Sequence, residues 1–279
     1  MGKSTRRPEM PNPVDASQRV ALWHEKAASI LVAARCQNTQ VERLPVELRP
    51  STVDEGFAIQ RKVSDALGRE TGAWKCALPT AGKVIAAPIY ADLIYRSVEC
   101  SISARSAQST VKAEPELACF IKRDLPPRRY AYSEAEVLDA LGDVHLALEL
   151  LGSRYSQPAS LTFPELLADG LFNAGLVIGP RVEFPDGATP DHLPAEFTIS
   201  LTTAGEAPVR LEGRHPDGNV LLPIVWLANF LRERGLGLQA GRAVITGSYG
   251  GVLELPLGRP LDIGFGDLGI LPIRFLFSE

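Results

Sequence analysis

The chain has 279 residues, of which 45% are hydrophobic and 22% charged, so it can bury a sizeable core and is not a disordered protein. A formal net charge of -4 and the lack of a long basic run exclude the electrostatic footprint of a nucleic-acid-binding protein. No apolar segment reaches the roughly 18 to 20 residues needed to cross a bilayer, and the N-terminus lacks the hydrophobic core of a signal peptide. We therefore expect a cytoplasmic protein without a membrane partner.

The N-terminal quarter of the chain predicts an arm followed by helices. Residues 1–15 are rich in proline and charge and are expected to form a mobile arm. Residues 16–72 predict a small helical part, because apolar residues recur at helical spacing from its start and a capping box at residues 52–55 begins a second helix.

Residues 73–279 consist mostly of short apolar runs separated by Pro, Gly and Asp, which predicts a β-rich domain. Two helices interrupt it: one follows a capping box at residues 133–136, and the other ends at Gly235. The fold class expected from these patterns is α+β, with a small helical N-terminal part and a β-rich domain.

Glu149 is an exception in the run "LALELL", which otherwise reads as a strand covered on both faces. An ionised carboxylate away from water is costly unless it is paired, hydrogen-bonded or bound to a cation. Two explanations are open at this point: Glu149 pairs with Arg154 or another cation, or it is a metal ligand.

Two further carboxylates, Glu114 and Glu116, lie two residues apart in "VKAEPELACFIK" and would share one face of a strand with Ala118 and Phe120. A shared divalent cation would remove their repulsion, and oxygen-only ligands favour Mg²⁺ or Mn²⁺. Pro115 between them predicts a strand end or a bulge. The simpler alternative is that both glutamates line a solvated strand face.

Several motifs in the same order favour the metal hypothesis, because together they resemble a known family. These are "AWKCAL", "EPELA" with "FIKRDLP", "LALELLGSRY", "WLANFLRERGLGLQAGRAVITGS" and "GDLGILPIRF". The chain resembles the 2-keto-4-pentenoate hydratase branch of the fumarylacetoacetate hydrolase superfamily, with gaps, over residues 53–275.

The resemblance implies Mg²⁺ or Mn²⁺ held by Glu114, Glu116 and Glu149 and chelated by a 2-keto acid. It also identifies Lys75 as an active-site lysine that stabilises negative charge or moves a proton. The alternative for Lys75 is a side chain that snorkels from a strand to solvent. The reaction implied is metal-dependent addition of water to a 2-hydroxy-2,4-dienoate, which gives a 4-hydroxy-2-oxo acid in the degradation of aromatic or steroid rings.

Departures from the family pattern leave other functions open. The usual Asp-Asn-Ala-Ser becomes "DGLF" at residues 169–172, which places Phe172 in the expected substrate pocket. The alternatives are 2-oxo-acid decarboxylation, C–C bond hydrolysis, or a non-catalytic metal-dependent partner subunit. We also expect a homo-oligomer, with a pathway enzyme as a further candidate partner.

Four more side chains are candidate site residues by their position in these motifs. Arg154 and Ser153 follow Glu149 and are expected to orient that carboxylate or bind the carboxylate of the substrate. Thr246 and Ser248 in "TGS" are expected to line the pocket, with a simple turn as the alternative.

Overall fold

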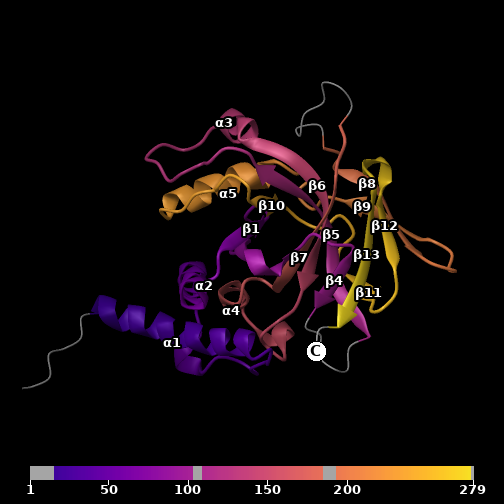
Figure 1. The fold of residues 1–279 in the computed structure, drawn as a ribbon. Helices are drawn as coiled ribbons and strands as arrows, with labels where there is room; N and C mark the ends of the chain where they lie inside the picture. Colours follow the sequence, from indigo (N-terminus) through magenta and orange to yellow (C-terminus); the bar gives the residue numbers. More distant parts are fainter. Residues whose placement is uncertain (1–15, 103–108, 185–192, 278–279) are drawn as a thin grey trace, which may run out of the picture.

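The computed structural model describes residues 16–102, 109–184 and 193–277 (Figure 1). The predicted arm at residues 1–15 lies outside these ranges. Within them, strands exceed helices, and the predicted α+β class is confirmed. None of the described helices is both long and apolar enough to span a bilayer.

The helices group on the outside of the strands (Figure 1). They are α1 (Ala16–Cys36), α2 (Val53–Leu67), α3 (Glu134–Asp139), α4 (Phe163–Ala168) and α5 (Leu222–Glu233). The capping boxes predicted for α2 and α3 are both present. Helix α4 was not expected from the sequence, although it too begins with a capping box.

The larger sheet forms the centre of the molecule. Its strands run in the order β2-β1-β10-β5-β6-β7-β3, and β11 pairs with one part of β5. Their bounds are β1 (Thr71–Cys76), β2 (Ala86–Tyr90), β3 (Ile94–Tyr95), β5 (Thr110–Ile121), β6 (Leu141–Leu151), β7 (Asn173–Arg181), β10 (Ala243–Ile245) and β11 (Leu253–Pro256).

This sheet curls until its two edges meet. Strands β2 and β3 stand at opposite ends of the strand order, yet only the single turn Ala91–Leu93 separates them in the chain. The concave side of the sheet holds one apolar cluster drawn from nearly all of its strands, and four of its members are small: Ala73, Ala118, Ala147 and Ala243. Small side chains leave room inside the curl for longer ones from neighbouring positions.

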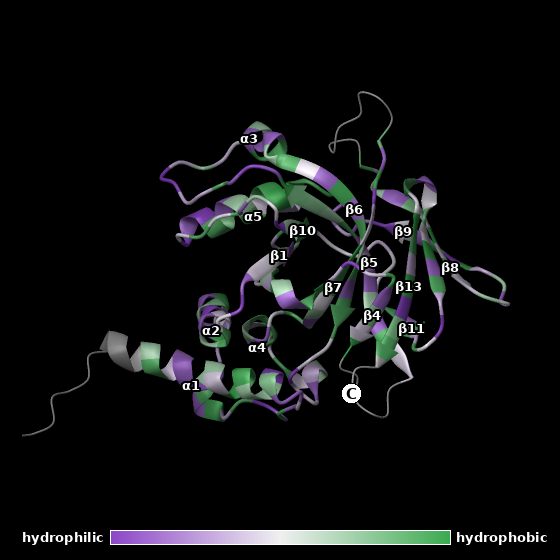
Figure 2. Cartoon of the chain, in the orientation of Figure 1, coloured by the Kyte–Doolittle hydropathy of each residue, from purple (hydrophilic) through white to green (hydrophobic). Residues whose placement is uncertain are grey.

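A second, smaller sheet packs against the first on the side away from α1 and α2 (Figure 1). Its order is β4-β13-β12-β8-β9, with bounds β4 (Glu99–Ile102), β8 (Glu196–Thr203), β9 (Val209–Arg214), β12 (Leu261–Phe265) and β13 (Ile270–Phe277). The main core fills the space between the two sheets and under α5. Hydrophobic residues accordingly concentrate in the central strands and in α5, whereas the peripheral loops are mostly hydrophilic (Figure 2).

A smaller core lies between α1 and α2 and includes Tyr155 from the segment after β6. The helical part therefore has an apolar cluster of its own. The sequence predicts a domain boundary near residue 72. Helix α2 also packs against α4, which lies beyond that boundary, so the division into two domains stays a prediction.

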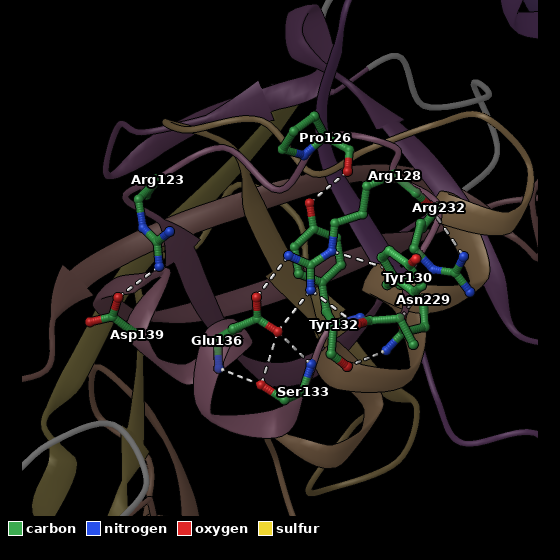
Figure 3. Close-up of polar contacts among 11 residues, drawn as sticks. Arg123, Pro126, Arg128, Tyr130, Tyr132, Ser133, Glu136, Asp139, Asn229 and Arg232 are labelled. Carbon is green, nitrogen blue, oxygen red and sulfur yellow. Dashed lines mark hydrogen bonds and ion pairs between the residues drawn. The ribbon is translucent and has the colours of Figure 1, made fainter.

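The loop between β5 and α3 is fastened to α5 by a polar network (Figure 3). Arg128 lies over the ring of Tyr132, 3.7 Å from its centroid, and binds Glu136 through two hydrogen bonds of 2.7 Å. The side chain of Asn229 accepts a hydrogen bond from the backbone N–H of Tyr132 and donates one to its carbonyl. These contacts stabilise the fold far from the acidic residues described next.

Candidate active site

Three carboxylates meet on the concave side of the large sheet. Antiparallel pairing of β5 with β6 sets Glu114 directly opposite Glu149, and Glu116 follows two residues along β5. One oxygen from each carboxylate lies within 4.8 Å of the others. Glu114 and Glu116 lie on one face of β5, since their oxygens meet, and Ala118 and Phe120, at the alternate positions that follow in the strand, lie in one apolar cluster, as predicted. We call these three glutamates the acidic triad.

Pro115 sits inside the 12-residue strand β5, not at a strand end or a bulge as expected. The reason is a change of neighbour along one edge of β5. The strand pairs with β11 up to Ala113 and with β10 from Ala118, so the residues between have no regular partner on that side. A proline that donates no hydrogen bond is tolerated in such a gap.

Lys75 supplies the cation that meets Glu149. Its Nζ lies 2.7 Å from both carboxylate oxygens of Glu149, and it also donates to the carbonyl oxygen of Leu171 at 3.1 Å. The side chain of Lys75 is 13% exposed and that of Glu149 is fully buried, so the alternative in which Lys75 snorkels to solvent is wrong. The alternative that pairs Glu149 with Arg154 or another cation is thus confirmed in its second form, because the partner is Lys75 and not Arg154.

The ionisation of these groups reflects burial and mutual repulsion. Burial raises the pKa of Glu116 well above its ordinary value, and the charge of Glu149 raises it further. Burial and Glu149 raise the pKa of Glu114 in the same way. Burial lowers the pKa of Lys75, but the contact with Glu149 outweighs that effect, and the net change is upward.

One ammonium against three carboxylates leaves two excess negative charges when all four groups are ionised. Like charges directly opposite on neighbouring strands destabilise a sheet. Glu114 accepts no hydrogen bond from the described residues, and Glu116 accepts one, from the backbone N–H of Gly247 at 2.7 Å. A hard divalent cation fits this arrangement, because the carboxylates have free oxygens and carry two negative charges that Lys75 does not neutralise.

Asn173 and Gly247 are two site residues that the sequence did not suggest. The amide Nδ2 of Asn173 donates to Oε1 of Glu149 at 2.8 Å, and the Asn173 side chain is buried. Gly247 lies in the predicted "TGS" turn, but its contact is to Glu116. The only available signal for Asn173 was a polar residue at the start of the apolar run "NAGLVIG".

A left-handed backbone turn lies against the lysine. Helix α4 ends at Ala168. Beyond its C-cap Asp169, Gly170 has a positive φ angle, and so do Leu171 and Phe172, at 53° and 67°. Each non-glycine residue in this conformation costs about 1–2 kcal/mol. The turn directs the carbonyl of Leu171 at Lys75, and strain of this kind is concentrated at functional sites.

Among the described residues, Arg154 forms no hydrogen bond or ion pair with Glu149, which corrects the expectation that it orients this carboxylate directly; its binding to a substrate carboxylate stays a prediction. Its Nε donates to Asp169 Oδ1 at 2.6 Å, one terminal nitrogen donates to the Asp169 carbonyl at 2.6 Å, and the other donates to the Asn173 carbonyl at 2.9 Å. The guanidinium is buried, and its hydrogen bonds hold Asp169 and the backbone of Asn173 in place.

The remaining predicted residues lie around the site with their polar groups engaged in the protein. The hydroxyl of Ser153 accepts from the N–H of Tyr155, and the buried hydroxyl of Thr246 bonds to the ring of His215 at 3.1 Å. Ser248 donates to the Gly251 carbonyl at 3.0 Å, as in a turn. The side chain of Phe172 is half-buried. Their roles toward a substrate stay predictions.

Curated relatives of the chain are hydratases. The 2-keto-4-pentenoate hydratase 1 of Dechloromonas aromatica (strain RCB) is 26% identical over 267 residues, which cover 90% of this chain and 96% of the relative. The 2-oxo-hept-4-ene-1,7-dioate hydratase of Escherichia coli is 25% identical over 270 residues, which cover 91% and 98%. No protein-family model matches the sequence.

Among solved structures, the fold is similar to that of 4-oxalocrotonate decarboxylase from Pseudomonas putida G7. The TM-score is 0.68 at 18% identity, over 95% of this chain and 100% of the decarboxylase, which was crystallised with calcium and acetate or with magnesium and adipate. The comparisons confirm the resemblance read from the sequence: the chain is an enzyme of the 2-keto-4-pentenoate hydratase type, and its fold is similar to that of fumarylacetoacetate hydrolase family proteins.

Proposed function

We propose that the chain adds water to a 2-hydroxy-2,4-dienoate to give a 4-hydroxy-2-oxo acid, with Mg²⁺ or Mn²⁺ held by Glu114, Glu116 and Glu149. The observation that carries this proposal is the convergence of three carboxylates, with one oxygen of each within 4.8 Å of the others, beside a single lysine. A divalent cation bound there would stabilise the negative charge that develops on the oxygens of a 2-keto acid during proton transfer.

Lys75 has the geometry for a charge-stabilising or proton-donating role. Its ammonium is anchored by Glu149 and by the Leu171 carbonyl, so its position is defined before a substrate arrives. Preorganised donors of this kind stabilise a developing anion without further rearrangement. The reaction needs protons and water, and no organic cofactor is part of the proposal.

The substrate side chain is proposed to lie near Phe172, whose half-buried ring occupies a position where the family usually has a small polar residue. Ser153, Thr246 and Ser248 complete the proposed lining. A bulky apolar ring there favours a larger or more apolar dienoate than the shortest one. A homo-oligomer in the cytoplasm, with or without a pathway enzyme bound, remains part of the proposal.

A spectrophotometric assay tests the reaction. Purified protein with Mg²⁺ or Mn²⁺ is given several freshly made 2-hydroxydienoates, and the loss of ultraviolet absorption from the conjugated system is followed with and without EDTA. We expect metal-dependent loss and a 4-hydroxy-2-oxo acid as product. Release of carbon dioxide would identify a decarboxylase instead, and no consumption of any dienol would exclude the hydratase.

A further inference from the structure

Asn173 is placed to control one carboxylate of the acidic triad. It is the first residue of β7, its side chain is 4% exposed, and its Nδ2 lies 2.8 Å from Oε1 of Glu149. The opposite orientation of the amide would set its oxygen against the carboxylate, with two acceptors facing each other. The chemistry of the contact therefore requires that the N–H points toward Glu149.

The hydrogen bonds around Glu149 are unequal at its two oxygens. Oε1 accepts from both Lys75 and Asn173, whereas within the described ranges Oε2 accepts from Lys75 alone. A carboxylate oxygen has two acceptor positions, so Oε1 is filled and Oε2 keeps one position open. We infer that Asn173 is a positioning residue that makes Glu149 present a single oxygen, Oε2, to the cation; the inference rests on the proposed function.

Asn173 is itself held by the backbone and by Arg154. The Arg154 guanidinium donates to the Asn173 carbonyl at 2.9 Å while it is bound to Asp169 at 2.6 Å. The left-handed turn that ends at Phe172 leads directly into Asn173, and its Leu171 carbonyl binds Lys75. One short segment therefore orients both groups that fill Oε1. Partners that orient a ligating carboxylate commonly change metal affinity 10- to 100-fold when removed, by general experience with metal sites.

The test compares two variants of the full-length chain. Asn173→Ala removes the amide, and Asn173→Leu removes it while it nearly preserves the side-chain volume. Asn229→Ala is the matched control, because that amide also bonds to backbone groups but lies in the network of Figure 3. Mn²⁺ binding is measured by calorimetry, and unfolding by urea is measured in EDTA.

We expect both Asn173 variants to bind Mn²⁺ about tenfold more weakly than the wild type, and Asn229→Ala to bind it as the wild type does. Folded Asn173 variants with unchanged Mn²⁺ affinity would overturn the inference. Loss of folding in both of them would also overturn it, since the residue would then be structural. A wild-type protein that bound no Mn²⁺ would contradict the proposed function instead.

Discussion

Two buried groups of charges in this molecule are built in opposite ways, and the short segment from Asp169 to Leu171 connects them. In the acidic triad, three carboxylates share one lysine. In the second group, which we call the arginine cluster, Asp169 and Glu165 are bound by Arg35, Arg43 and Arg154. The triad has free oxygens and, when all its groups are ionised, excess negative charge, whereas each carboxylate of the arginine cluster has at least one guanidinium of its own.

The acidic triad has carboxylate oxygens available to a ligand, whereas the carboxylates of the arginine cluster are already bound by protein groups. Asp169 accepts hydrogen bonds from the Arg154 side chain and backbone, and Glu165 accepts two from Arg43, of 2.8 and 2.7 Å. Carboxylates satisfied in this way stabilise the fold and have little left to offer a cation. Burial of an acidic residue is therefore a poor guide to function unless its partners are counted.

The largest effect is expected from the triad. Glu149→Gln keeps the shape of the side chain but removes the charge on which Lys75 and the proposed cation converge. Activity should fall about a thousandfold or more, equivalent to about 4 kcal/mol of transition-state stabilisation, and Mn²⁺ binding should be lost. Calorimetry and the dienol assay measure both, and retained Mn²⁺ affinity would show that Glu149 is not a ligand.

In the arginine cluster, substitution should affect stability first. Asp169→Asn leaves the buried guanidinium groups of Arg35 and Arg154 without their counter-charge, which costs about 3–5 kcal/mol. Urea unfolding should show this loss in EDTA and in Mn²⁺ alike. Asp139→Asn is the control, because its pair with Arg123 is exposed (Figure 3) and should cost less than about 1 kcal/mol. Equal losses in the two variants would contradict the assignment.

Glu165 gives the arginine cluster a pH dependence. Burial opposes its ionisation, but hydrogen bonds from Arg43 and from Thr162 outweigh burial and lower the pKa of Glu165 below 4.5. A depressed pKa in the folded state means that this stabilisation is present above about pH 4.5 and is lost as the pH falls through the folded value. Glu165→Gln should be less stable than the wild type at pH 7 and should approach it in acid; parallel curves of unfolding free energy against pH would contradict this.

The smallest effect should be a gain in stability. Glu114→Gln removes one of two like charges that face each other across β5 and β6, so the metal-free protein should become more stable by about 0.5 kcal/mol. The same variant should gain less stability from added Mn²⁺ than the wild type does. Thermal unfolding with EDTA and with Mn²⁺ measures both changes. A metal-free variant less stable than the wild type would mean that repulsion in the triad is already relieved.

Local patterns in the sequence were sufficient for much of the fold. Capping boxes predicted the starts of α2 and α3, and short apolar runs predicted most of the strands. The short elements α4, β2, β3, β4 and β9 were not predicted. The closure of the large sheet depends on pairing between distant segments, which no local pattern encodes.

For the site as well, local patterns predicted some features, whereas contacts between distant segments were missed. Strand alternation correctly placed Glu114 and Glu116 on one face, since that rule needs only neighbouring residues. Arg154 was expected beside Glu149 because the two are close in the chain, but β6 ends at Leu151 and the segment beyond it turns toward Asp169. The contact of Asn173 with Glu149 joins different strands and became visible only in three dimensions.

Helix α1, although distant in the sequence, also contacts Asp169. Arg35, in its last turn, donates to the carbonyl of Asp169 and forms an ion pair with its carboxylate, and burial lowers the pKa of this guanidinium to about 10. Asp169 is the residue from which the left-handed turn toward Lys75 departs. Deletion of α1 would therefore remove one of the two guanidinium groups that bind Asp169, and we expect the turn beside Lys75 to be held less firmly as a result.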